Sequence, residues 1–287
     1  MASRACCAHM ARTMTSTQEP APVAVRPPSA AGLYYPKDEA LLRAALRELL
    51  RTRPSAAPEE RPKAVVVPHS AYTYSGAVAA SAYRSLRSAS ATIRHVVLVG
   101  PTHRTQMRGL AMPSCTWFAT PCGTVPINDA ARQRLRELGL AGIADAPHAA
   151  EHSLEVQLPF LQEVLEQFDL LPIAVGSAQP EQVARALEAV WGGPETFVVV
   201  SSDLSHHHTH TEAERLDEST AASIIARRSD LSDAQACGAQ SINGLLEVAR
   251  RKNLDVRLLD RCTSGDAAGD SCRVVGYGSF GLYEATH

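Results

Sequence analysis

The chain has 287 residues, and its 28 Lys and Arg side chains nearly balance its 30 Asp and Glu side chains, for a formal net charge of −2. This balance excludes a strongly basic nucleic-acid binder and an acidic, solvating chain. Hydrophobic residues make up 45% of the sequence, enough for a sizeable core, and no apolar run approaches the roughly 18 residues that cross a bilayer. We therefore expect a globular, cytoplasmic protein with neither nucleic acid nor membrane as a partner.

The first 28 residues differ in character from the rest of the chain. They are rich in Pro, Ser, Thr and Ala and contain no apolar segment of the kind found in signal peptides. The seven Cys are an odd number with no disulfide-framework spacing, so reduced thiols are expected. We predict a disordered tail over 1–28 and a single domain over 29–287.

Beyond the tail, helical and strand-like segments alternate along the chain. A helix over Glu39–Leu50 comes first, with Leu42, Leu46 and Leu49 on one stripe. The remaining expected segments are, in order, strand Ala64–Val67, helix Gly76–Leu86, strand His95–Val99, helices Asp129–Leu138 and Leu154–Phe168, strand Leu170–Val175, helix Glu181–Val190, strand Phe197–Val200, helix Glu212–Arg227, a helix starting near Ala239, and strands Leu254–Leu259 and Val274–Tyr283.

The strands indicate the fold class. Several are too continuously apolar to have one solvated face, which is typical of strands covered by helices on both faces. We therefore predict an α/β fold, a single-domain mixed sheet flanked by helices. Gly276 and Gly278 in the last strand indicate a bulge or a close approach of another segment.

Titratable side chains follow three of the predicted strands. His69 and His103 come directly after two of them, and a third is followed by Asp203 and His206. Ligands of α/β sheets bind outside the carboxyl ends of the strands, so these side chains are candidates for one shared site. A single loop histidine is more often solvated; three strand ends with this chemistry are a stronger signal.

Two further segments carry candidate residues with a structural alternative. Glu151 and His152 precede Ser153 at a predicted helix start, where they serve either as a helix cap or as partners of a metal-bound histidine. Cys237 precedes another helix start, where a thiol can act as metal ligand or nucleophile, or be an inert buried residue. In the tract from His206 to His210 we expect only His206 to point into the site.

The ordered motifs resemble one known family. They are Pro68-His69-Ser70-Ala71-Tyr72-Thr73-Tyr74-Ser75-Gly76, Gly100-Pro101-Thr102-His103, Thr120-Pro121-Cys122-Gly123, Glu151-His152-Ser153-Leu154-Glu155, Ser201-Ser202-Asp203-Leu204-Ser205-His206, Cys237-Gly238 and Ser264-Gly265-Asp266. From about Arg26 onward the chain resembles the Memo family (mediator of ErbB2-driven cell motility), known in prokaryotes as AmmeMemoRadiSam system protein B. That family is similar in fold to the class III extradiol dioxygenases.

The resemblance implies a site and its roles. The metal ligands fall on His69, His103 and Cys237, and His206 takes the place of the dioxygenase acid/base histidine, with Asp203 beside it. The pocket residues carried over are Glu151, His152, Tyr72 and Tyr74. The sequence departs from the family pattern at Ser70-Ala71, where Ala-Gly is usual, and at Cys122, where Leu is usual.

Two imidazoles and a thiolate suit iron, copper or zinc, and by the resemblance we place iron first. The leading hypothesis is a redox-active metal protein acting on a small molecule or peptide. A zinc- or Cys-dependent hydrolase and a non-enzymatic metal or peptide carrier are the alternatives. The resemblance also suggests AMMECR-type and radical SAM proteins as partners.

Overall fold

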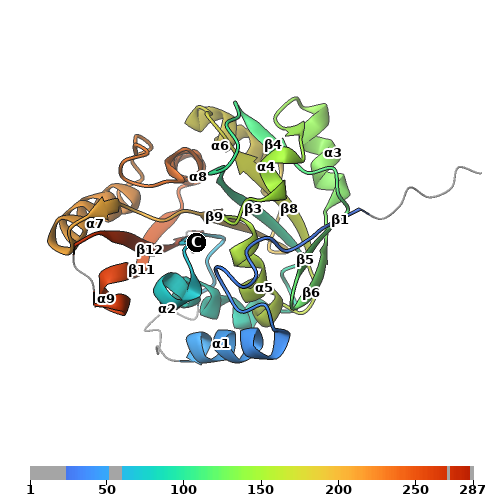
Figure 1. The fold of residues 1–287 in the computed structure, drawn as a ribbon. Coiled ribbons are helices and arrows are strands. Elements are labelled where there is room, and N and C mark those ends of the chain that lie inside the picture. Colours follow the sequence, from blue (N-terminus) through green and yellow to red (C-terminus); the bar gives the residue numbers. More distant parts are fainter. Residues whose placement is uncertain (1–23, 52–59, 270–271, 285–287) are drawn as a thin grey trace, which may run out of the picture.

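The computed structural model describes residues 24–51, 60–269 and 272–284, and a mixed nine-stranded sheet lies at its centre (Figure 1). The strands are β1 Val25–Arg26, β2 Ala64–Val67, β3 His95–Pro101, β4 Leu110–Met112, β5 Trp117–Thr120, β6 Gly123–Pro126, β7 Gly142–Ile143, β8 Asp169–Val175, β9 Thr196–Ser201, β10 His206–His208, β11 Asp255–Thr263 and β12 Val274–Tyr283. The helices are α1 Glu39–Arg51, α2 Tyr72–Tyr83, α3 Asp129–Glu137, α4 Ala146–Ala149, α5 Leu158–Val164, α6 Pro180–Ala189, α7 His210–Ile225, α8 Ala239–Arg251 and α9 Ser264–Ala268, with 3-10 turns η1 Arg84–Ala89 and η2 Glu155–Gln157.

The order of the strands places three of them side by side at the centre of the sheet. The sheet runs β10-β12-β2-β9-β3-β8-β4-β7, and β11 pairs with β12. Strands β2, β9, β3 and β8 are parallel, β12 pairs antiparallel with β2, and β4 pairs antiparallel with β8 and parallel with β7. Strands β1, β5 and β6 form a separate small sheet. The α/β fold with a mixed sheet is confirmed.

Helices cover both faces of the sheet. Because side chains alternate along each central strand, successive residues pack against helices on opposite faces. In β2, Ala64 and Val66 pack into a core that includes residues of α6, α7 and α8. Val65 and Val67 pack into a second core with residues of α1, α2 and α5 on the other face. Figure 1 shows these two groups of helices on opposite sides of the sheet. The strands are therefore buried on both faces, as their apolar composition predicts.

The start of the ordered fold differs from the predicted boundary. Residues 24–28 are not a disordered tail: β1 pairs with β5, and the buried Arg26 forms an ion pair with Glu155, which is also buried. Glu155 also accepts hydrogen bonds from the backbone N–H groups of Ser29 and Ala30. A buried carboxylate needs such partners, and they tie this segment to η2. The other residues of the predicted tail, 1–23, lie outside the described residues.

The predicted helix over Leu154–Phe168 is shorter in the structure. Its first residues form η2, and α5 runs only from Leu158 to Val164. Pro159 occupies the first turn of α5, a position where its missing N–H costs nothing. None of the helices in the described ranges has the length and apolar character needed to span a membrane.

Candidate metal centre

The predicted site residues lie at one edge of the sheet because three neighbouring parallel strands end there. His69 follows β2, His103 follows β3 and Asp203 follows β9, which lies between the other two strands. The carboxyl ends of parallel strands share one edge, so residues far apart in sequence meet. The segment between α4 and η2 adds His152, and the loop before α8 adds Cys237.

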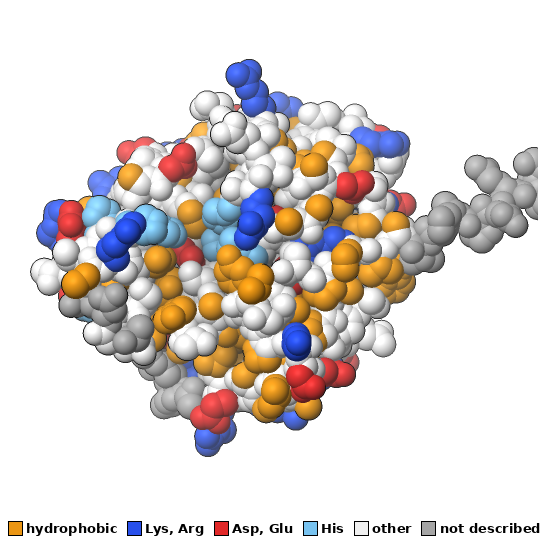
Figure 2. All heavy atoms as spheres, viewed as in Figure 1, with side chains coloured by type: hydrophobic (Ala, Val, Ile, Leu, Met, Phe, Trp, Pro, Cys, Tyr) orange, Lys and Arg blue, Asp and Glu red, His pale blue; other side chains and the backbone are white. Residues whose placement is uncertain are grey.

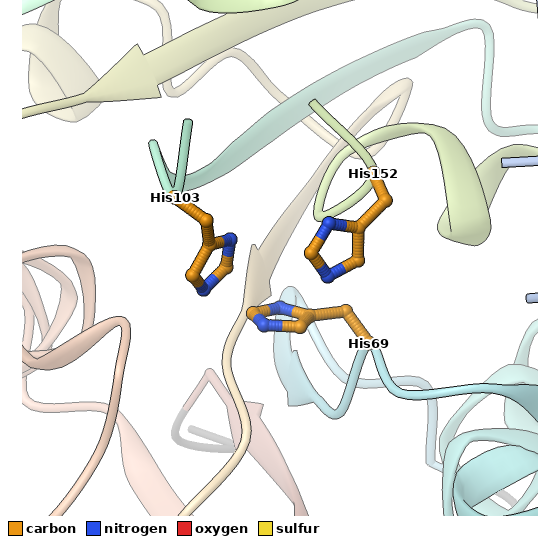
Figure 3. A group of neighbouring side chains, drawn as sticks. All are labelled: His69, His103 and His152. Carbon is orange, nitrogen blue, oxygen red and sulfur yellow. The ribbon is translucent and has the colours of Figure 1, made fainter. Parts of the chain in front are cut away.

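Three histidines turn their rings toward one another at this edge (Figure 3). One ligand-capable atom from each of His69, His103 and His152 lies within 4.8 Å of the others, a spacing that could hold a metal ion. The ring centroids of His69 and His103 are 5.0 Å apart. Cys237 Sγ lies 3.3 Å from His69 Nε2. The group whose ligand atoms lie within 4.8 Å of one another is thus His69, His103 and His152. It contains two of the three sequence-predicted ligands and His152, which the sequence placed only in the surrounding pocket, whereas Cys237 lies beside His69 and is not part of the group.

The tautomer of His69 is set by its hydrogen bonds. Ser201 Oγ donates its proton to the carbonyl of Ser153 at 2.6 Å, so toward His69 Nδ1, 3.0 Å away, it can only accept. The Gln157 side-chain amide also donates to this hydroxyl. His69 Nδ1 therefore carries the proton, and Nε2, the nitrogen facing Cys237, is left with a free lone pair for a metal.

Glu151 fixes His103 in the same way. Its Oε1 lies 3.0 Å from His103 Nδ1, and its Oε2 accepts the His103 backbone N–H at 2.6 Å. The backbone N–H groups of His152 and Ser153 also donate to Oε1. Burial raises the pKa of Glu151, but the hydrogen bonds from His103 and Ser153 outweigh it and hold the pKa far below its usual range. An ionised carboxylate thus orients His103 with Nε2 free.

His152 is held mainly by its neighbours' rings. Tyr34 stacks on it with ring centroids 4.2 Å apart, and His103 stacks on it at 4.9 Å. Its Nδ1 is buried and has no well-aligned hydrogen bond among the described residues, although Glu151 Oε1 lies 3.2 Å away. A buried ring nitrogen without a partner is costly in a metal-free site.

The two more buried histidines are neutral near pH 7, the form that binds metal. Burial lowers the pKa of His69 to about 4, and burial together with His69 lowers the pKa of His152 to about 3. For Cys237, burial and then the nearby Asp203 raise the pKa of the thiol to about 12. Without metal this thiol is protonated; metal coordination would deprotonate it.

Cys237 reaches the site because the next residue is a glycine. A Cβ on Gly238 would lie 2.7 Å from Ser202 Cβ and 2.9 Å from the Ser201 carbonyl oxygen. The Gly238 N–H donates to Ser202 Oγ at 2.9 Å. The start of α8 is thereby held directly against the end of β9, beside His69.

Asp203 holds His69 in place through a hydrogen bond to its backbone. Its Oδ1 accepts the His69 backbone N–H at 2.8 Å, and its Oδ2 accepts the Ser70 hydroxyl at 2.7 Å. Oδ2 also lies 4.0 Å from His69 Nε2. Ser70, one of the departures from the family pattern, thus has a defined role as a partner of Asp203. Ala71, the other, has φ −57°, so its Cβ strains no backbone.

His206 lies in β10, which pairs with β12, and it is half-buried. Two other histidines of the tract, His208 and His210, have partners away from the metal centre. His208 Nδ1 lies 3.3 Å from a Glu212 oxygen, and His210 Nε2 lies 3.0 Å from an Asp266 oxygen. Of this tract, His206 has an electrostatic effect on His69, contributing to the lowering of its pKa.

The two tyrosines of the predicted pocket have different positions. Tyr72 is buried in the core, where its ring contacts Phe160 and its hydroxyl donates to the Val156 carbonyl at 2.6 Å. Tyr74 is exposed and lines a separate pocket of about 350 Å³ together with Ser70 and Tyr277. Neither ring is among the residues lining the cleft beside the histidines.

A cleft of about 870 Å³ opens from the metal centre, and His103 and Cys237 lie in its lining. Figure 2 shows histidine side chains at the surface of this face, with a basic side chain beside them. The donor set of imidazole nitrogens and one thiol fits iron, copper or zinc. The unpartnered Nδ1 of His152 and the free Nε2 atoms of the other two histidines are consistent with a bound ion.

Comparison with known protein sequences identifies the family. The profile of the family described as Memo-like protein matches residues 26–281. The chain belongs to the Memo-like protein family. A "MEMO1 family protein" of Aquifex aeolicus is 32% identical over 267 residues, covering 88% of this chain and 97% of that relative. One of Thermotoga neapolitana is 33% identical, covering 88% and 98%. The resemblance seen in the motifs is therefore confirmed.

The fold is also similar to that of a solved structure of low sequence identity. The crystal structure of an uncharacterized Escherichia coli protein, JW3007, matches with a TM-score of 0.50 and 13% identity. The match covers 77% of this chain and 99% of that chain. Within the Memo-like family, then, the present chain has a histidine group that could hold a metal ion.

Proposed function

We propose that the chain is a metal-dependent redox protein that holds iron or copper and acts on a small molecule. One observation carries this proposal. His69 and His103 each use Nδ1 in a hydrogen bond, so that both Nε2 atoms are free for a metal, and Cys237 Sγ lies 3.3 Å from His69 Nε2. Second partners of this kind orient metal-binding histidines in known sites.

Each residue has a separate task in the proposed site. His69, His103 and Cys237, whose sulfur lies beside His69, are the proposed ligands, and His152, the third member of the histidine group, is a further donor. A bound iron or copper would supply electron transfer with oxygen. Asp203 fixes the His69 backbone, and His206 is the nearby residue proposed to accept or donate the substrate's proton.

The structure favours this proposal over a Cys-dependent hydrolase. A thiol nucleophile needs a lowered pKa, whereas burial and Asp203 raise the pKa of Cys237 to about 12. No described basic side chain donates a hydrogen bond to its sulfur: the nearest groups are His69 Nε2, Ser202 Oγ and the Asp203 carbonyl. The thiol is therefore better suited to bind a metal than to attack an ester.

Elemental analysis of the protein tests the proposal. The chain would be purified without oxygen from cells supplied with iron, copper and zinc, alongside His103→Ala and Cys237→Ser. Two matched controls are His95→Ala, at the other end of β3, and Cys272→Ser, at an exposed position. Near-stoichiometric iron or copper that is lost in the two site variants and kept in both controls supports the proposal.

Two other results would count against it. A protein that binds only zinc and consumes no oxygen with any reductant would be a hydrolase or a carrier. A protein whose metal content is unchanged by Cys237→Ser would not use the thiol as a ligand, and His152→Ala would then show whether three histidines hold the ion.

A further inference from the structure

The cleft beside the metal centre has two walls of different chemistry. One wall is the segment from Pro101 to Arg108, which joins β3 to β4. The other wall is the start of α8, where Gly238, Gln240 and Ser241 line the cleft. At about 870 Å³ the cleft has the size of a small-molecule site.

The first wall carries two basic side chains. Arg104 and Arg108 both line the cleft and are exposed, and within the described ranges neither forms an ion pair with a carboxylate. By contrast, Arg43 and Arg47 share Glu163, and Arg251 binds Glu181. Asp233 is the acidic residue of the lining, and its carboxylate accepts a weak hydrogen bond from Gln240.

Arg104 is the basic residue nearer to the metal centre. It interacts with the hydroxyl of Tyr34, and the ring of Tyr34 stacks on His152. Its guanidinium is therefore positioned between the cleft and the histidine group. A guanidinium presents paired N–H donors that match the two oxygens of a carboxylate or phosphate.

The second wall offers hydrogen-bond donors that have no partner. α8 begins after Gly238, which has no side chain to cap it, and the backbone N–H groups of Gln240 and Ser241 have no hydrogen-bond partner in the described parts of the chain. Ser241 is fully buried beneath the cleft, and its hydroxyl also has no partner there. A buried hydroxyl left unpaired costs free energy that a bound oxygen would recover.

We propose that this cleft binds the anionic group of a small-molecule substrate, a carboxylate or a phosphate, between Arg104 and Arg108 on one side and the start of α8 on the other. This inference rests on the proposed function, because it places the rest of the substrate beside the metal ligands His103 and Cys237. The arginines supply charge and paired donors, and the positive end of the α8 dipole adds to them. A neutral or cationic substrate would leave the charge of both arginines without a carboxylate or phosphate partner.

Matched aromatic probes test the inference. Benzoate and benzamide have nearly the same shape and differ in charge, and phenyl phosphate separates a phosphate preference from a carboxylate preference. Their affinities would be measured by calorimetric titration of the protein as purified and after metal removal. The variants are Arg104→Gln, Arg108→Gln, Arg104→Lys and Ser241→Ala, and Arg87→Gln in the exposed part of η1 is the control.

We expect benzoate or phenyl phosphate to bind at least tenfold more tightly than benzamide. Each Arg→Gln change should weaken the anion by about tenfold or more, the effect of losing a charge-assisted hydrogen bond, and leave benzamide unchanged. Arg104→Lys should recover only part of the loss, because an ammonium lacks the paired donors. Ser241→Ala should weaken the anion by a smaller factor, and Arg87→Gln should have no effect.

The outcomes separate this inference from the proposed function. Equal affinities for benzoate and benzamide in protein that holds its metal would overturn the anion site and leave the redox proposal standing. Benzoate binding that is lost when the metal is removed but is unaffected by both Arg→Gln changes would also overturn the anion site, because the carboxylate would then be a metal ligand. Anion binding that depends on the arginines in a protein that takes up no iron or copper would support the cleft and refute the redox proposal.

Discussion

Glu151 is the residue whose loss should disturb the metal centre most without removing a ligand. Its Oε1 faces three donors, the His103 ring and the backbone N–H groups of His152 and Ser153, while its Oε2 faces the His103 backbone N–H at 2.6 Å. In Glu151→Gln the carbonyl oxygen can keep the three donors. The amide NH₂ then faces the His103 N–H, and two donors meet in a buried site.

The cost can be assembled from these contacts. One unsatisfied buried N–H costs about 1–3 kcal/mol, and each of the three remaining hydrogen bonds weakens by roughly half a kcal/mol when its acceptor loses its charge. We expect Glu151→Gln to lower the free energy of unfolding of the metal-free protein by about 3 kcal/mol. Because the bond to the His103 ring weakens and the amide NH₂ repels the His103 backbone N–H, the ring is less well oriented, and metal affinity should also fall by about 10- to 100-fold.

Urea unfolding of the metal-free protein and competition with a chelator measure the two effects. The matched control is Glu163→Gln, whose carboxylate contacts Arg43 and Arg47 near the surface and should contribute less than about 1 kcal/mol. If Glu151→Gln were no more destabilising than the control and bound metal equally well, the assignment of Glu151 as the residue orienting His103 would be refuted.

Three further predictions concern the surrounding structure. Burial lowers the pKa of His148 to about 4, from 6.5 in an unfolded chain, so the unfolded state takes up a proton first as the pH falls. The stability that depends on neutral His148 is complete above pH 6.5, and about 3 kcal/mol of it should be lost between pH 6.5 and pH 4. In urea unfolding measured against pH, His148→Gln should abolish this loss. Glu155→Gln leaves buried Arg26 without its ion-pair partner and should cost about 3–5 kcal/mol in the same assay, and a loss below 1 kcal/mol would contradict a buried pair. Gly238→Ala should displace Cys237 and weaken metal binding, whereas Gly142→Ala, where a Cβ would meet nothing within 4 Å, should bind metal normally in chelator competition.

The strands were predictable because their signal is local. Ala64–Val67 is a continuous apolar run, Val274–Tyr283 is rich in β-branched and aromatic residues, and the structure places strands at both. The close approach predicted at Gly276 is also present, since a Cβ there would overlap the buried Asp217 carboxylate. The short strands β4 to β7 were missed, because two to four residues give too little periodicity to detect.

The positions of side chains around the metal centre depend on contacts that sequence spacing does not contain. His152 joins the histidine group because Glu151 binds the His103 backbone, 48 residues earlier in the chain. Tyr34, which stacks on His152, carried no motif signal. Tyr72 was expected in the pocket, but α2 begins at Tyr72 rather than at Gly76, and the ring packs against Phe160 in the core.

The assembly of the metal centre from separate segments of the chain has a thermodynamic consequence. The donors on His69, His103, His152 and Cys237 come from four separate segments, so an unfolded chain does not hold them together. Any ion that binds all of them binds the native state alone, and its binding free energy adds to the free energy of unfolding. At a free metal concentration of 100 times Kd this amounts to about 2.7 kcal/mol, and the unfolding midpoint should continue to rise with further metal. The thermal stability of the protein thus reports how fully the site is occupied, independently of any substrate.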